Sequence, residues 1–228
     1  MIRRAFSILC HQRRRLRPSD ALAGVTLAMF VALSAPGIPA LADAAPGEAM
    51  AEVKSTVDQV LEILKNPEYK SAAAVRRQKL RDVIGVHFDF ADMSRSALGV
   101  HWKSLSQDQR SEFVPVFKNL MEAVYMSRIE SYSGQEIKIL REKSDNSDYA
   151  EVYTSIAQEA AQPISVNYRL KHTDQGWKVY DVIVDGISLV ANYRNQFNRV
   201  INSKGYAELV RQIKARSGES PPASGKSS

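Results

Sequence analysis

The spacing of apolar residues changes near residue 133, and this change constrains the fold more than any other feature of the sequence. Before it, apolar side chains recur every three or four residues, as at Phe113, Phe117 and Leu120, which is the period of an α-helix. After it they alternate with polar ones, as along residues 164–171, which is the period of a half-buried strand. The helical period returns at Leu189. This order predicts an α+β fold in which helices precede and follow a sheet.

Capping and turn residues give the expected bounds of the elements. Asp89 and Ser188 are placed to cap helices, Ser106 and Gln109 form a capping-box pattern, and Pro115 is expected to bend the longest helix. The expected helices are Glu48–Lys65, Val75–Val86, Asp89–Leu98, Gln107–Tyr132, Leu189–Ile201 and Tyr206–Arg216. Short turns predict a four-stranded antiparallel meander with the strands Glu136–Glu142, Tyr149–Ile156, Ile164–Lys171 and Trp177–Val184.

The first 42 residues have the three parts of a secretory signal peptide. An arginine-rich start is followed by the apolar segment Ala21–Leu33 and by the small-residue cleavage pattern Ala40-Leu41-Ala42. The apolar segment is too short to cross a bilayer, which takes about 20 residues. We expect a signal peptide over 1–42, export to a bacterial periplasm, one domain over 43–216, and a disordered Gly/Ser/Pro-rich tail over 217–228.

The excess positive charge of the chain is concentrated in that leader. The sequence has 31 basic and 25 acidic residues, a net charge of +6. Six of the basic residues and one acidic residue precede Asp43, which leaves 25 basic against 24 acidic residues in the remainder. A nucleic-acid partner is therefore not expected, because the domain has no excess charge from which to build a basic face. The one cysteine, Cys10, also lies in the leader, so the domain has no disulfide or thiol nucleophile.

Four ionisable residues close together in the sequence are candidates for a metal site. They are His87, Asp89, Asp92 and His101. Their spacing matches no standard metal site, and helix capping already accounts for both aspartates. We therefore expect no metal and no other cofactor.

Two aspartates at the end of the fourth strand are the candidates for catalysis. Paired carboxylates such as Asp181 and Asp185 can act as general acid and base. They can equally be structural partners for Arg169 and Arg194. A periplasmic α+β enzyme with Asp181 or Asp185 as general base stays open as the alternative function.

Three segments of the chain resemble one known family, the MlaC proteins, which are periplasmic phospholipid-binding shuttles also called toluene-tolerance auxiliary proteins. The resemblance covers about Val53 to Arg216, and Pro115 departs from it. The segments contain Phe88-Asp89-Phe90-Ala91-Asp92-Met93, Leu105-Ser106-Gln107-Asp108-Gln109-Arg110-Ser111-Glu112-Phe113, Trp177-Lys178-Val179-Tyr180-Asp181-Val182 and Asn192-Tyr193-Arg194-Asn195-Gln196-Phe197.

The resemblance implies a soluble, non-enzymatic carrier that holds acyl chains in an apolar cavity between the sheet and the helices. Its partners would be an inner-membrane ABC lipid transporter complex and an outer-membrane lipoprotein–porin complex, and we expect the carrier itself to be a monomer. The ligand would be a phospholipid or, as in a related branch, a hopanoid.

The residues expected to line the cavity are apolar or aromatic. We expect Tyr180, Val182 and Val184 to share one face of the fourth strand. Leu120 and Val124 of the long helix are the expected opposite wall. The full expected lining is Phe90, Met93, Phe117, Leu120, Met121, Val124, Tyr125, Val166, Tyr168, Tyr180, Val182, Val184, Leu189 and Tyr193.

Overall fold

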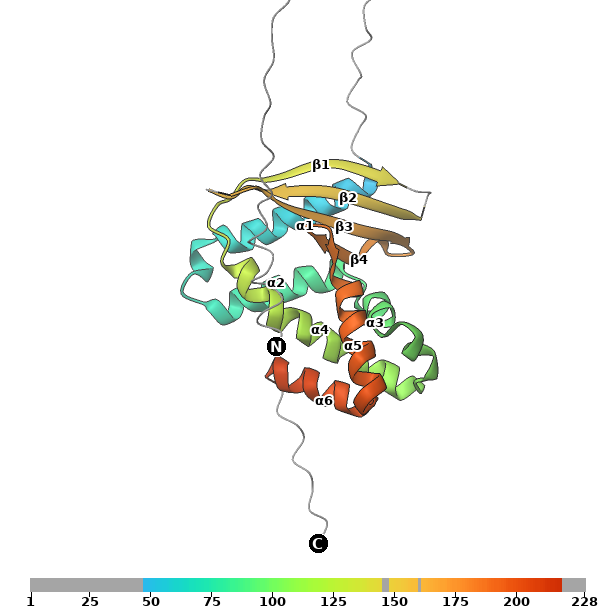
Figure 1. Ribbon diagram of the computed structural model, residues 1–228. Helices are drawn as coiled ribbons and strands as arrows, with labels where there is room; N and C mark the ends of the chain where they lie inside the picture. Colours follow the sequence, from blue (N-terminus) through green and yellow to red (C-terminus); the bar gives the residue numbers. More distant parts are fainter. Residues whose placement is uncertain (1–46, 145–147, 160, 219–228) are drawn as a thin grey trace, which may run out of the picture. The chain divides into compact units, whose positions relative to one another are not determined.

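The computed structural model of the chain describes residues 47–144, 148–159 and 161–218 (Figure 1). These residues belong to one compact unit within Ala44–Ser228. The signal peptide predicted over 1–42 and nearly all of the tail predicted over 217–228 lie outside the described residues, so both stay predictions.

The described elements alternate as the sequence predicts, with helices on either side of a sheet. Four helices come first: α1 (Glu48–Lys65), α2 (Ala73–His87), α3 (Phe90–Leu98) and α4 (Gln107–Glu130), with the short 3-10 helices η3 (Pro67–Tyr69) and η4 (Gly99–Ser104) between them. The sheet follows, in the order β1 (Ile137–Ser144), β2 (Tyr149–Ile156), β3 (Ile164–Thr173), β4 (Gly176–Val184) and β5 (Ile187–Ser188), and then α5 (Leu189–Lys204) and α6 (Tyr206–Ser217). The α+β class and the antiparallel meander are confirmed.

The sheet has five strands and not the predicted four. The fifth, β5, is two residues long and pairs with the end of β4. Asp185 and Gly186, between the two strands, both have positive φ, 47° and 81°, which is the backbone of the tight hairpin turn that an Asp-Gly pair favours. A two-residue strand is too short to show an alternating pattern, which is why the sequence did not indicate it.

The predicted helix caps are present in the structure. Asp89 and Ser188 each accept the backbone N–H three residues further on, at 2.8 Å and 3.0 Å. Ser106 and Gln109 exchange the two hydrogen bonds of a capping box at the start of α4. That helix ends at Glu130, slightly before the predicted Tyr132.

A bulge in β4 corrects the predicted face of Tyr180. Arg169 of β3 pairs with Asp181, and the next residue, Leu170, pairs with Val179, so Tyr180 has no partner across the ladder. A bulge adds one residue to one strand and inverts the alternation of faces beyond it. The ring of Tyr180 therefore lies on the other face of the sheet, where it packs edge-on against Tyr149 at 6.0 Å.

A carboxylate from the sheet caps the first helix. The β1 strand also has a register shift, between Ile139 and Arg141, and beyond it the Glu142 carboxylate accepts the backbone N–H of Met50 at 2.8 Å. Gly47, the N-cap of α1, offers no side chain, and a Cβ there would lie 2.3 Å from the Glu142 carboxylate. Glu142 thus replaces a local cap and fixes the start of α1 against the sheet.

The apolar interior is divided into two clusters. In Figure 1, α1 lies directly against the sheet, and α3 to α6 gather below it, with α3 and α5 in contact with β4. The sheet cluster joins α1 to β2, β3 and β4, and its most buried members are Ala49, Val53, Val152 and Leu170. The helical cluster joins α3 to α6 and is centred on Phe113, Phe117, Leu120 and Phe197.

Candidate functional site

Most of the predicted lining residues lie in one of the two clusters. Of the fourteen, the helical cluster contains Phe90, Met93, Phe117, Leu120, Met121 and Tyr193. The sheet cluster contains Val166, Tyr168, Val182, Val184 and Leu189, and Tyr125 packs against both clusters. The remaining two, Val124 and Tyr180, belong to neither.

The predicted wall opposite β4 is wrong. Val182 and Val184 lie in the sheet cluster with α1, whereas Leu120 is buried in the helical cluster. Val124 is 39% exposed. The inward ridge of α4 passes through Phe117, Met121 and Tyr125 at intervals of four, so the residue just before Tyr125 is turned about 100° away.

Two aromatic side chains, Phe88 and Tyr125, connect the clusters, and we call the region between the clusters where these side chains lie the junction. Both pack against each cluster. Phe88 follows α2 in an extended conformation, forms a single bridge with Val179, and stacks on Phe90 with the ring centroids 6.0 Å apart. Tyr125 hydrogen bonds to Tyr193, and burial raises the pKa of both hydroxyls. Phe88 lies in a segment that carries the family resemblance, but it is not among the predicted lining residues.

The sheet cluster contains few polar atoms, and two of them have no hydrogen-bond partner among the described residues. Burial raises the pKa of Tyr168 to about 12, and no hydrogen bond offsets the loss of water around its hydroxyl. The indole Nε1 of Trp177 is buried and has no acceptor in the part of the chain that the structure describes. Thr154, in contrast, donates to the carbonyl of Val166 at 2.5 Å. Surroundings of this kind suit an apolar ligand better than a polar one.

The two candidate catalytic aspartates hold the backbone. Asp181 is 5% exposed and accepts hydrogen bonds from Ser188 Oγ at 2.6 Å and from the N–H of Val190 at 3.2 Å. The Arg169 guanidinium is its ion-pair partner at 3.7 Å, in agreement with the structural alternative given for Asp181 in the sequence analysis. Asp185 lies in the β4–β5 turn and accepts the N–H of Ser165 at 3.0 Å. Both carboxylates therefore have structural partners.

The four residues weighed as metal ligands do not come together. His87 contacts Glu52 at 2.6 Å, His101 contacts Asn198 at 2.8 Å, and Lys171 bridges the two aspartates. Across residues 47–144, 148–159 and 161–218, no three His, Cys, Asp or Glu side chains are grouped so that they could hold a metal ion.

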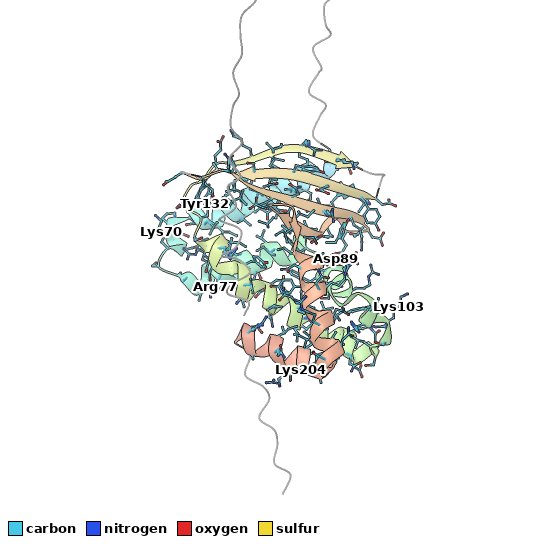
Figure 2. The ribbon with its side chains drawn as sticks, in the orientation of Figure 1. Lys70, Arg77, Asp89, Lys103, Tyr132 and Lys204 are labelled. Carbon is cyan, nitrogen blue, oxygen red and sulfur yellow. The ribbon has the colours of Figure 1, made fainter. Side chains whose placement is uncertain are left out.

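A strip of ion pairs connects α2, which Phe88 directly follows, to α4, which contains Tyr125. Arg77, labelled in Figure 2, forms a two-point contact with Glu130 at 3.2 and 2.5 Å, and its hydrogen bonds lower the pKa of that carboxyl. One turn further on, Arg81 binds Glu122 at 2.8 Å. The order of these pairs along the two helices shows that α2 and α4 run antiparallel along this strip.

Two open grooves lie elsewhere on the surface. One, of about 310 Å³, runs between α4 and α6 past Gln109, Tyr206 and Val210, and the other, of similar volume, runs between α1 and α2. None of the fourteen predicted residues lines either groove. In the part of the chain that the structure describes, no helix is both long and apolar enough to cross a membrane.

Comparisons with known proteins connect this architecture to lipid-binding relatives. The model of a family described as MlaC protein matches residues 54–215. The intermembrane phospholipid transport system binding protein MlaC of Haemophilus influenzae is 28% identical over 120 residues, which are 51% of this chain and 56% of that protein. Toluene tolerance protein ttg2D of Pseudomonas putida is 26% identical over 170 residues, 73% of this chain and 79% of that protein.

A solved structure has the same fold. It is the phospholipid-binding protein of Ralstonia solanacearum in complex with a phospholipid. The likeness has a TM-score of 0.68 at 26% identity and covers 76% of this chain and 98% of that chain. The sequence match to the Haemophilus relative, by comparison, spans little more than half of that protein's length.

Proposed function

The chain belongs to the MlaC family, and from this premise we propose that it is a periplasmic phospholipid-binding transport protein. The observation that carries the proposal is the family match over residues 54–215 together with the likeness to a protein solved with a phospholipid. The family comprises lipid-binding transport proteins and not enzymes, so the alternative of an Asp181 or Asp185 base is not kept.

We further propose that the protein carries phospholipid, as a monomer, between an inner-membrane ABC transporter complex and an outer-membrane lipoprotein–porin complex. The relative from Haemophilus, named for intermembrane transport, supports this route. The near balance of 25 basic and 24 acidic residues after the predicted leader also supports it, because a strongly basic carrier would stay on anionic membrane surfaces. Nothing in the described residues favours a hopanoid over a phospholipid, so phospholipid is the proposed ligand.

The proposed place for the acyl chains is the junction. Twelve predicted lining residues belong to the two clusters that meet there, and in this structure they are packed within those clusters. Acyl chains that entered would separate the two clusters at Phe88 and Tyr125 and cover the apolar surfaces thus exposed. Each methylene removed from water contributes about 0.8 kcal/mol, so a ligand with two long chains can offset the loss of the junction contacts.

Organic extraction followed by mass spectrometry tests the proposed ligand. Protein purified from the periplasm of a bacterial host should yield phospholipid in a fixed ratio to protein. A protein that carries no lipid after mild purification, and takes up none from phospholipid vesicles, would refute the proposed function.

A cross-link across α2 and α4 tests the proposed entry site. In a Cys10→Ser background, Arg77→Cys with Glu130→Cys would be joined by a short bis-maleimide, since side chains that meet end to end stand too far apart for a disulfide. We expect the cross-link to block lipid uptake by delipidated protein and lipid release by loaded protein.

The matched control joins another ion pair of the same kind, at Glu112 and Lys214, which are 2.7 Å apart and connect α4 to α6. This cross-link should leave lipid exchange unchanged. If both cross-linked proteins exchange lipid like the uncross-linked ones, the chains enter elsewhere.

A further inference from the structure

Several basic side chains surround the segment 86–92, which leads from α2 into α3 beside the junction. One of them, Lys118, differs from the others in its hydrogen-bond partners. Lys171 binds Asp92 at 2.9 Å, Arg95 binds the same carboxylate, and Lys178 donates to a carbonyl of α2 at 2.8 Å. Lys118, on α4, has no carboxylate, carbonyl or hydroxyl acceptor among the residues that the structure describes. The fold therefore does not neutralise this ammonium.

The position of Lys118 is set by aromatic and backbone neighbours. Its Nζ lies 5.6 Å from the centroid of the Phe90 ring, which stacks on Phe88. A Cβ built on Gly85 of α2 would lie only 3.3 Å from the same Nζ. The ammonium therefore bridges α4 and α2 next to the strip of ion pairs, one aromatic ring away from the junction.

A phospholipid places a negative charge beside its acyl chains. If the chains occupy the junction, the phosphodiester lies at its edge, where Lys118 is half-buried. An ammonium that is partly removed from water without a partner is costly, and a charge-assisted hydrogen bond to phosphate offsets that cost. A lysine that merely covered apolar surface with its stem would instead direct its charge into water, away from the ring and the α2 backbone.

We propose that Lys118 is the residue that binds the phosphate of the ligand, by donating from Nζ to the phosphate oxygens. This inference rests on the proposed function, since it assumes that acyl chains occupy the junction. The inference goes beyond the proposed function because it assigns the preference for a phosphate-bearing lipid to one side chain. Phosphate is the recognised group, whether it comes from a lipid or from solution, and the experiment separates these sources.

The chain offers a matched control in Lys79. Its Nζ lies 5.3 Å from the centroid of the Tyr69 ring, and among the described residues it too has no oxygen acceptor. It lies in the groove between α1 and α2, away from the junction. Lys79→Met therefore removes the same charge and the same kind of ring contact as Lys118→Met.

The test compares two ligands that share their acyl chains, dioleoyl phosphatidylglycerol and dioleoylglycerol. Full-length chains would be expressed for export, purified and delipidated, and both dissociation constants measured for the wild type and for Lys118→Met, Lys118→Arg and Lys79→Met. We expect Lys118→Met to reduce the preference for the phospholipid about tenfold, the worth of one hydrogen bond to a charged group, and to leave dioleoylglycerol binding unchanged. Lys118→Arg and Lys79→Met should keep most of the wild-type preference.

Two results would overturn the assignment while leaving the proposed function intact. One is a Lys118→Met protein with the wild-type preference, and the other is an equal loss of both ligands, which would make the residue structural. Inorganic phosphate should not bind the delipidated protein, and saturable binding that depends on Lys118 would assign the site to free phosphate. Failure of the wild type to bind either lipid would refute the proposed function and this inference together.

Discussion

The hydroxyl of Tyr168 gives a quantitative test of how well the sheet cluster excludes water. Its pKa in the folded protein is about 12, raised by burial alone, against an ordinary value of 10.0. Between these two values the unfolded chain loses the proton and the folded chain keeps it, so the free energy of unfolding falls as the pH rises. At pH 11 the loss due to this one group should be about 1.4 kcal/mol, and it should vanish at pH 8.

Tyr168→Phe removes the group without removing a hydrogen bond. We expect its free energy of unfolding at pH 8 to be close to that of the wild type, because no hydrogen bond to the described part of the protein is lost. Denaturant unfolding at pH 8 and pH 11 should then show a pH dependence shallower by about 1.4 kcal/mol.

Tyr206 is the control, since its pKa is also raised to about 12 but its hydroxyl donates to the carbonyl of Gln109 at 2.9 Å. Tyr206→Phe should lose about 1 kcal/mol at pH 8, whereas Tyr168→Phe should not. An unchanged alkaline dependence in Tyr168→Phe would mean that water reaches this face of the sheet, and that the cluster is not the dry lining inferred above.

Four further outcomes follow from the same contacts. Glu142→Gln should lower the free energy of unfolding by about 1 kcal/mol in urea, since a neutral amide caps α1 less well, and no loss would mean that the carboxylate is not needed there. Val184→Trp should stay folded but yield no extractable phospholipid, because the indole takes acyl-chain space, and an unfolded variant would show that Val184 is ordinary core. Arg77→Gln should speed lipid release, and 0.5 M NaCl should speed release more in the wild type than in the variant. Equal effects of salt on the two proteins would mean that this ion pair does not control release. EDTA should leave lipid binding unchanged, and a loss would point to a metal.

The features that the sequence predicts correctly are those set by neighbours along the chain. The caps at Asp89, Ser106 and Ser188 need only a side-chain oxygen and a backbone N–H three residues on. The helices and strands follow from periods of 3.6 and 2. These patterns were sufficient for the α+β class and for most element bounds.

The features that it missed depend on pairings between distant residues. The bulge that turns Tyr180 to the other face exists only in register with β3. The contact between Glu142 and Met50 joins residues 92 positions apart. The apolar pattern alone also could not show that Leu120 and Val182 belong to different clusters. Periodicity shows which face of a helix or strand is buried, but not which other element covers that face.

The division of the interior also bears on how such a chain tolerates change over evolution. A substitution deep in the helical cluster, at Phe113 for example, has neighbours that differ from those of Val152 in the sheet cluster. The effects of mutations that share no partner on stability are nearly additive. Substitutions in one cluster therefore need no compensating substitutions in the other. Among the described residues, Phe88 and Tyr125 are the side chains that pack against both clusters, so a substitution there must suit both. These two positions should therefore accept the fewest substitutes among members that keep the fold.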